Sequence, residues 1–208
     1  MASTKTSGFT LLEVMIALSV ILILSGIAVM TLQPTLQAER VNNAYNTTLT
    51  SLRLAREAAA ADMRIYVVSF SGPVTGANPN GGTITVTQNS TTGTQLFSTI
   101  LPSDVTFHVE PGVPTSPTTA PTTPDGFGSA ANVFDFDQGI GTAGGTTIYF
   151  YPDGTAHDLN GNINNGVVYL GRPGFLGTCR AITLWGATSR LRGWRLYQNS
   201  GVWSWSQQ

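Results

Sequence analysis

Glu13 is the residue with the clearest chemical consequence, because it is an acid inside an apolar run. Residues 9–32 carry no other charge. A carboxylate in a membrane span costs about 2.5–3.5 kcal/mol on insertion scales, so its partner must be a cation. Cleavage between Gly8 and Phe9 would create an α-amino group four residues from Glu13. We interpret Glu13 as a functional carboxylate, neutralised by that amine from the same chain or from a packed neighbour.

Arginines form a second group with potential chemistry. The formal net charge of −1 excludes a globally basic nucleic-acid binder, but residues 159–208 hold five arginines and no acid, whereas residues 65–158 hold seven acids and no Lys or Arg. In an extended strand Arg190 and Arg192 lie on the same face, and we expect Arg180 and Arg195 to widen that patch. The alternative is that the arginines pair with the acidic middle of the same domain.

Other constellations favour structural roles. Cys179 is the one cysteine, which excludes an internal disulfide and a multi-cysteine metal site. The segment from Asp158 to Asn164 alternates oxygen side chains as a calcium loop does, but it lacks the expected glycine and glutamate, so we interpret it as a turn. His108 and His157 have no second ligand at metal spacing. We predict no enzyme, no metal site and no cofactor.

One long helix must carry Glu13. Residues 9–32 span about 36 Å as a helix, enough to cross a bilayer core of about 30 Å. Residues 33–63 continue as an amphipathic helix, with apolar side chains at spacings of three and four, and Pro34 lies inside. Residues 1–8 form a polar leader that we expect to be removed.

Beyond the helix the pattern changes to strands. β-branched and aromatic runs, separated by Gly, Pro and Asn, predict strands at 65–70, 83–87, 95–100, 105–109, 133–136, 146–151, 166–170, 180–185 and 191–197. Residues 111–124 contain five Pro and five Thr, so they form a mobile surface loop of polyproline character. We predict an α+β fold in which the helix packs on an antiparallel β-domain covering residues 64–208.

The segment Gly8-Phe9-Thr10-Leu11-Leu12-Glu13-Val14 resembles the class III signal of type IV prepilins. The resemblance implies that a prepilin peptidase cleaves between Gly8 and Phe9 and methylates the new N-terminus at Phe9. It also implies that the chain is retained in the bacterial inner membrane with its globular domain in the periplasm. Glu13 would then act in assembly with other pilin subunits into a filament.

Looser similarities point to the GspH/FimT group of minor pilins and pseudopilins. They are found in residues 52–58 and 148–154 and around Arg190 and Arg192. This group implies a structural subunit that primes or caps a type IV pilus or a type II secretion pseudopilus. Some members bind DNA for uptake through a C-terminal Gly-Arg-x-Arg, and this chain keeps both arginines but has Ser189 in place of the glycine. DNA uptake is therefore the alternative function.

Overall fold

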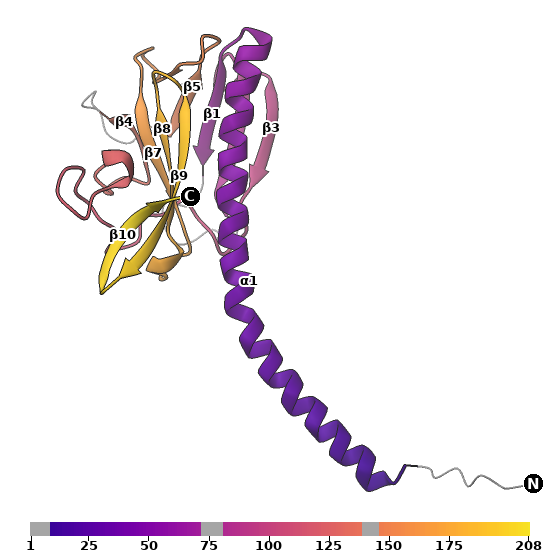
Figure 1. Ribbon diagram of the computed structural model, residues 1–208. Helices are drawn as coiled ribbons and strands as arrows, with labels where there is room; N and C mark the ends of the chain where they lie inside the picture. The colour runs from indigo at the N-terminus through magenta and orange to yellow at the C-terminus, as the bar shows by residue number, and fades with distance from the viewer. Residues whose placement is uncertain (1–8, 72–80, 139–145) are drawn as a thin grey trace, which may run out of the picture. The chain divides into compact units, whose positions relative to one another are not determined.

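The chain folds as one long N-terminal helix followed by antiparallel sheets, which confirms the predicted α+β class (Figure 1). The computed structural model describes residues 9–71, 81–138 and 146–208. Helix α1 spans Leu11–Asp62. The other elements are β1 (Tyr66–Ser71), β2 (Thr83–Gln88), β3 (Gln95–Ile100), η1 (Pro124–Gly126), β4 (Phe134–Gln138), β5 (Thr147–Phe150), β6 (Ala156–His157), β7 (Asn165–Leu170), η2 (Leu176–Thr178), β8 (Arg180–Trp185), β9 (Arg190–Asn199) and β10 (Val202–Gln207).

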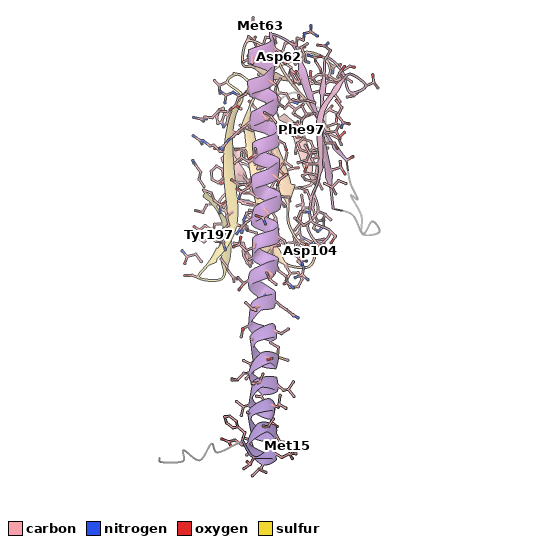
Figure 2. All side chains as sticks on the ribbon, turned by 90° about the vertical axis from the view of Figure 1, so that its right-hand side faces the viewer. Met15, Asp62, Met63, Phe97, Asp104 and Tyr197 are labelled. Carbon is pink, nitrogen blue, oxygen red and sulfur yellow. The ribbon has the colours of Figure 1, made fainter. Side chains whose placement is uncertain are left out.

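The first half of α1 belongs to a compact unit that reaches to Glu39, and the rest of the chain, Arg40–Gln208, forms a second unit. Every residue from Phe9 to Leu36 is exposed, and side chains project from all sides of the helix around Met15 (Figure 2). Nearly every position here is apolar, so this half has no polar face. Among the described residues, α1 is the one helix long and apolar enough to cross a membrane.

The second half of α1 buries one stripe of side chains. Its buried residues recur at intervals of three and four, as an amphipathic helix requires; they are Val41, Ala44, Tyr45, Thr48, Leu49, Ser51, Leu52, Ala55 and Ala59. The two hydroxyls in this stripe donate to carbonyls of the preceding turn, Thr48 to Ala44 and Ser51 to Thr47, each at 2.8 Å. The stripe is therefore buried without leaving these hydroxyls unpaired.

Two five-stranded antiparallel sheets complete the second unit. Their strand orders are β3-β2-β1-β5-β6 and β10-β9-β8-β7-β4. In the first sheet Val68 pairs with Val86 and Ile148. In the second, Ile182 pairs with Val168 and Gly193. Because side chains alternate across a strand, these registers place rows of apolar residues on one face of each sheet.

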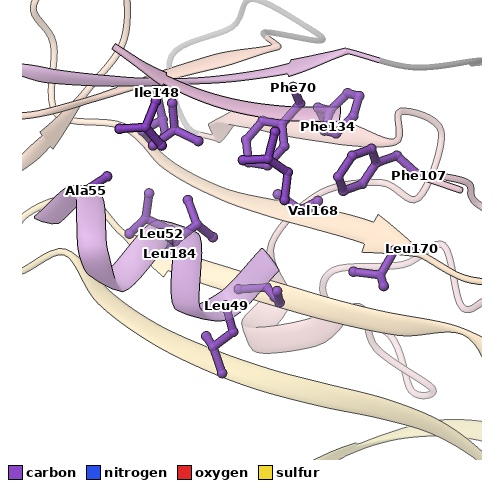
Figure 3. Packing of buried hydrophobic residues seen from close by; sticks show 14 of the residues in the cluster. Leu49, Leu52, Ala55, Phe70, Phe107, Phe134, Ile148, Val168, Leu170 and Leu184 are labelled. Atoms are coloured by element: carbon purple, nitrogen blue, oxygen red, sulfur yellow. The ribbon is translucent and has the colours of Figure 1, made fainter. Parts of the chain in front are cut away.

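The main core lies between the buried stripe of α1 and these faces of the two sheets. Leu52 lies beside Leu184, and Ile148 faces them from the first sheet (Figure 3). Leu49 and Val168 belong to the same cluster. At the other end of the core, the Phe70 ring stacks on Phe134 at 5.1 Å between centroids and meets Phe107 edge-on at 5.4 Å. Helix and sheets thus share one continuous apolar cluster.

Gly193 permits the close approach of α1 and β9. A Cβ atom at Gly193 would lie 1.4 Å from the hydroxyl oxygen of Tyr45, so no larger residue fits unless the Tyr45 ring moves. Burial raises the pKa of the Tyr45 hydroxyl above its usual value. A glycine in the middle of a strand, which is normally unfavourable, is explained here by helix packing.

A second apolar cluster covers the opposite face of the second sheet. Val113, Phe127 and Ala130 pack there against residues of β7, β8 and β9. Both ends of the Thr/Pro segment 111–124 take part in this covering layer, since Val113, Pro114, Thr123 and Pro124 are buried, while residues 117–122 are exposed. The segment is thus a surface loop in its middle and part of the folded domain at its ends.

The strand predictions fail in three places, one of which is the short strand β6, which was not predicted. Residues 105–109 form no strand and make only one isolated bridge, between Thr106 and Gly171. Val105 and Phe107 are nevertheless buried, so their alternation reflects packing of an irregular segment into the core. Strand β10 was not predicted, and it pairs with β9 through a tight turn at Ser200 and Gly201, both with positive φ.

Candidate functional site

Thr10 and Glu13 together begin helix α1. The Thr10 hydroxyl accepts a hydrogen bond from the backbone N–H of Glu13 at 3.3 Å, and the Thr10 carbonyl accepts one from Val14 at 3.2 Å. Thr10 is therefore the N-cap, and Glu13 occupies the third helical position of a Thr-x-x-Glu capping-box sequence, where a carboxylate interacts favourably with the positive end of the helix dipole. The Thr-x-x-Glu spacing was the sequence signal for this second role of Glu13.

The carboxylate of Glu13 lies on an apolar helix surface. Its neighbours along the helix are Phe9, Val14, Ala17, Leu18 and Ile21. Phe9 is 82% exposed. Residues 9–39 contain no Lys, Arg or His, so no side chain of this stretch supplies a counter-charge for Glu13. The predicted cleavage position Gly8 lies outside the described residues.

Arg190 and Arg192 lie on the same face of β9, as their spacing predicts. Arg192 belongs to a polar cluster around Asp125. Arg192 donates to one carboxylate oxygen of Asp125 at 2.6 Å, and Thr183 donates to the other at 2.5 Å. The guanidinium of Arg190 lies 5.2 Å from the centre of the Trp185 ring, within cation–π range. Asp125 belongs to the acidic middle of the chain, and sequence reasoning did not single it out because it lies in a Pro-Asp-Gly turn.

Arg180 and Arg195 lie on the opposite side of the sheet from Arg190 and Arg192. Arg180 pairs in register with Arg195, while Arg192 pairs with Thr183, so strand alternation separates the two sets. Arg180 is only 3% exposed. Its guanidinium donates to Asn42 on α1 at 3.1 Å and to the carbonyls of Thr178 and Cys179. The four arginines therefore do not form one surface patch.

Burial and a neighbouring like charge explain why the pKa of Arg180 is lowered. Burial is the larger cause, and the neighbouring Arg195 adds to it; together they lower the pKa of Arg180 to about 10. Burial raises the pKa of the nearby Cys179 thiol to about 11, so it is a poor nucleophile at neutral pH. Arg180 links the second sheet to α1 through Asn42, whereas Cys179 packs in the apolar cluster on the other face of that sheet.

The calcium-like segment is a closed turn. One carboxylate oxygen of Asp158 accepts the backbone N–H groups of Asn160 and Asn162, each at 2.8 Å. Burial opposes ionisation of Asp158, but these donors and the Asn162 side chain outweigh it and keep the pKa of Asp158 below its usual value. No cluster of three potential metal ligands occurs in the part of the chain that the structure describes.

Comparison with protein-family models gives one match, the prokaryotic N-terminal methylation motif, over residues 3–29. Comparisons with curated proteins and with solved structures find nothing that matches. The matched residues include Phe9 and Glu13 and most of the exposed apolar half of α1. The motif, the apolar helix and the α+β fold support a type IV pilin-like protein that is anchored in a membrane and has a structural role.

Proposed function

We propose that this chain is a minor pilin or pseudopilin of the GspH/FimT group, which primes or caps a type IV pilus or a type II secretion pseudopilus. In this proposal a prepilin peptidase removes residues 1–8 and methylates Phe9. Residues 9–32 then anchor the subunit in the bacterial inner membrane, and the globular domain lies in the periplasm until other pilin subunits incorporate it into a filament.

The observation that carries the proposal is Glu13. It is a carboxylate on an apolar helix surface, in a stretch of sequence that contains no cation. Such a group is costly in a membrane unless a positive charge meets it. The N-terminal amine of a neighbouring subunit, created by cleavage before Phe9, has the required charge and would lie at the required depth. Pairing of this kind makes assembly the step at which Glu13 matters.

The test separates the charge of Glu13 from its place in the capping box. Glu13→Gln keeps a side-chain oxygen at the third helical position but removes the charge, and Glu13→Ala removes both. We expect both variants to be cleaved normally and to be at least about tenfold depleted in sheared filaments, because a charge pair away from water contributes more than about 1.4 kcal/mol. Glu39→Gln, which removes the other acid of the same helix segment, is the matched control. Incorporation of Glu13→Gln at the normal level would contradict the role of the charge.

DNA contact is the second candidate, and the exposure of Arg190 beside Arg192 favours it. The footprint is small, since Arg192 is held by Asp125 and Arg180 is buried. Anisotropy titration of the full chain with single- and double-stranded DNA at two salt concentrations tests it. Salt-sensitive binding that is lost in Arg190→Ala, but kept in Arg195→Ala on the opposite face, would support DNA uptake. Absence of binding at low salt would exclude it.

A further inference from the structure

Two of the four sheet edges lack the features that normally prevent a strand from pairing with another chain. The edge strands are β3 and β6 in the first sheet and β10 and β4 in the second. Natural edges are usually short or carry charges. β6 has two residues, and β4 has two aspartates among its five residues. β3 and β10 have six residues each and no charged side chain, so these two edges are open to pairing.

The outer edge of β3 presents backbone groups without a partner. In an antiparallel pair, alternate residues direct their N–H and C=O groups to the neighbouring strand, and the others direct theirs away. Leu101, just after β3, donates to the residue before β2 at 2.8 Å, so the groups of Ser98 and Ile100 point away from β2. No backbone hydrogen bond reaches these groups from another element in the part of the chain that the structure describes. Phe97 and Thr99 line a groove with α1, so the side chains of Ser98 and Ile100 lie on the other face of the sheet.

The outer edge of β10 is open in the same way. Gln208, just after β10, donates to Gly193 of β9 at 2.9 Å, so the backbone groups of Trp203 and Trp205 point away from β9. Among the described residues, no other element makes a backbone hydrogen bond to them. Their side chains pack in the apolar cluster on the face of the second sheet opposite α1. On both edges, therefore, the residues with outward backbone groups have side chains on the face away from α1.

β3 and β10 run in opposite directions along α1 (Figure 1). The chain after β3 reaches the start of the second unit, where Asp104 forms an ion pair with Arg40. β8 begins in the same region, since Arg180 bonds to Asn42, and two antiparallel pairings give β10 the direction of β8. Copies anchored in one membrane have their α1 helices pointing the same way. The β3 strand of one copy is then antiparallel to the β10 strand of the next.

We propose that β3 of one copy pairs with β10 of a second copy, with Ser98 opposite Trp205 and Ile100 opposite Trp203. In this register the outward backbone groups of the two strands face one another, and both α1 helices stay on the same side of the joined sheet. Ile100, which is 62% exposed in the single chain, packs against Trp203 of the second copy. Each copy uses two different edges, so the contact is heterologous and a third copy adds in the same way.

This inference deepens the proposed assembly function, because it names the surface through which the globular domains join. It rests on the membrane anchoring of that proposal for the shared direction of the copies. It does not depend on Glu13, since both edges belong to the second unit.

The test is disulfide cross-linking of the full chain in lipid vesicles. In the proposed register Thr99 lies opposite Ser204 in a non-hydrogen-bonded pair, whose Cα atoms are about 4.5 Å apart, within the range that a disulfide bridges. A mixture of Thr99→Cys and Ser204→Cys chains should give a cross-linked dimer, and a chain with both substitutions should give a ladder of larger species. The native Cys179 is buried, and burial raises the pKa of its thiol to about 11, so the wild type should give no dimer.

Ser98→Cys mixed with Ser204→Cys is the matched control for geometry. Ser98 is adjacent to Thr99 but its side chain lies on the other face of the sheet, so the yield of dimer should be about tenfold lower. Equal yields from Ser98→Cys and Thr99→Cys, a dimer formed by Thr99→Cys chains alone, or no dimer in the mixture would overturn the proposal.

A second pair of variants tests the backbone contact itself. Ser98→Pro removes the outward N–H but no bond to β2, whereas Ser98→Ala keeps that N–H. Ser98→Pro should lower the yield of the Thr99–Ser204 cross-link about threefold or more, and Ser98→Ala should leave it unchanged. If guanidinium unfolding shows that Ser98→Pro does not fold, Ile100→Lys decides, because a charge placed between the edges should lower the yield about tenfold. Equal yields in the edge variant and in Ser98→Ala would contradict the pairing.

Glu13→Gln separates this inference from the proposed function. That substitution should deplete the chain from filaments but leave the Thr99–Ser204 cross-link in vesicles unchanged. Loss of the cross-link in Glu13→Gln would mean that the contact follows from helix assembly rather than from the strand edges, and would overturn the proposal.

Discussion

Both halves of helix α1 carry apolar side chains, but only the second half buries them within its own chain. From Phe9 to Leu36 the apolar side chains point in all directions and none is buried, whereas from Val41 to Ala59 a single stripe is buried against two sheets. The second half obtains its stability from its own chain. The first half exposes large aliphatic residues that water disfavours, so it needs lipid or neighbouring subunits around it.

Polar groups in the two halves also differ in whether their partners lie within the chain. In the second half the hydroxyls of Thr48 and Ser51 bond to their own helix, and Arg180 reaches from the sheet to Asn42. In the first half Ser19 and Ser25 also bond to their own helix, but Glu13 has no cation in its stretch of sequence. This difference supports the proposal that Glu13 pairs with the α-amino group created by cleavage before Phe9.

Truncating one leucine in each half of α1 should give the largest difference between the halves in the free energy of unfolding. Leu52 is 1% exposed, and Leu52→Ala should lower the free energy of unfolding of the second unit by about 2–5 kcal/mol. Leu22 is 72% exposed, and Leu22→Ala should leave that free energy unchanged. All four tryptophans lie in Arg40–Gln208, so guanidinium unfolding of the full chain followed by tryptophan fluorescence reports this unit. Equal effects of the two variants would contradict the comparison.

Replacing a glycine by alanine should show the same contrast between the two halves, with a smaller change in the free energy of unfolding. Gly193→Ala forces the Tyr45 ring to move and should cost about 1–3 kcal/mol in the same unfolding experiment. Gly26→Ala, in the first half, meets nothing within 4 Å and should have no effect on it. Adding Tyr45→Phe to Gly193→Ala should recover part of the loss, since it removes the nearest atom. No recovery would mean that the remaining ring carbons of Tyr45, at 2.6 and 3.1 Å, account for the crowding.

The smallest expected effect is at the end of the second half, where the Tyr66 hydroxyl donates to Asp62 at 2.5 Å. This hydrogen bond is the main cause that raises the pKa of Tyr66 above its usual value. Because the pKa of Tyr66 is higher in the folded state than in the unfolded state, the protonated hydroxyl stabilises the fold fully below pH 10. This stabilisation is lost as the pH rises through the pKa of Tyr66 in the folded protein. Tyr66→Phe should therefore cost about 0.5–1.5 kcal/mol at pH 8 and less at pH 11, measured by guanidinium unfolding at both values.

Periodicity in the sequence was enough to predict the class of fold. The change from three- and four-residue spacing before Met63 to alternation after it predicted one helix followed by strands, and the apolar run before Pro34 predicted the exposed segment. Local patterns worked because strands such as β1, β2 and β7 have buried residues that the sequence must encode. The pattern misled at residues 105–109, where burial of Val105 and Phe107 does not come with strand pairing.

Long-range pairing explains what the sequence did not show about the candidate sites. Arg180 was grouped with the surface arginines, but its partner Asn42 lies 138 residues away. Asp125 and Arg192 are likewise 67 residues apart. The position of Arg195 on the other face of β9 was available from parity alone, because an odd residue cannot share a strand face with Arg190 and Arg192. Strand β10 had a signal as well, the Ser-Gly turn at residues 200–201.

Mass spectrometry of the N-terminal peptide of the mature protein, purified from its native membrane, tests the central claim most directly. The account predicts a chain that begins at Phe9 and carries one added methyl group on its α-amine, with Glu13 unmodified. Gly8→Asp should abolish that peptide and leave residues 1–8 attached. A mature chain that retains residues 1–8 in the wild type, or one cleaved beyond Leu32, would contradict the pilin-like account, because neither would place an α-amino group beside Glu13.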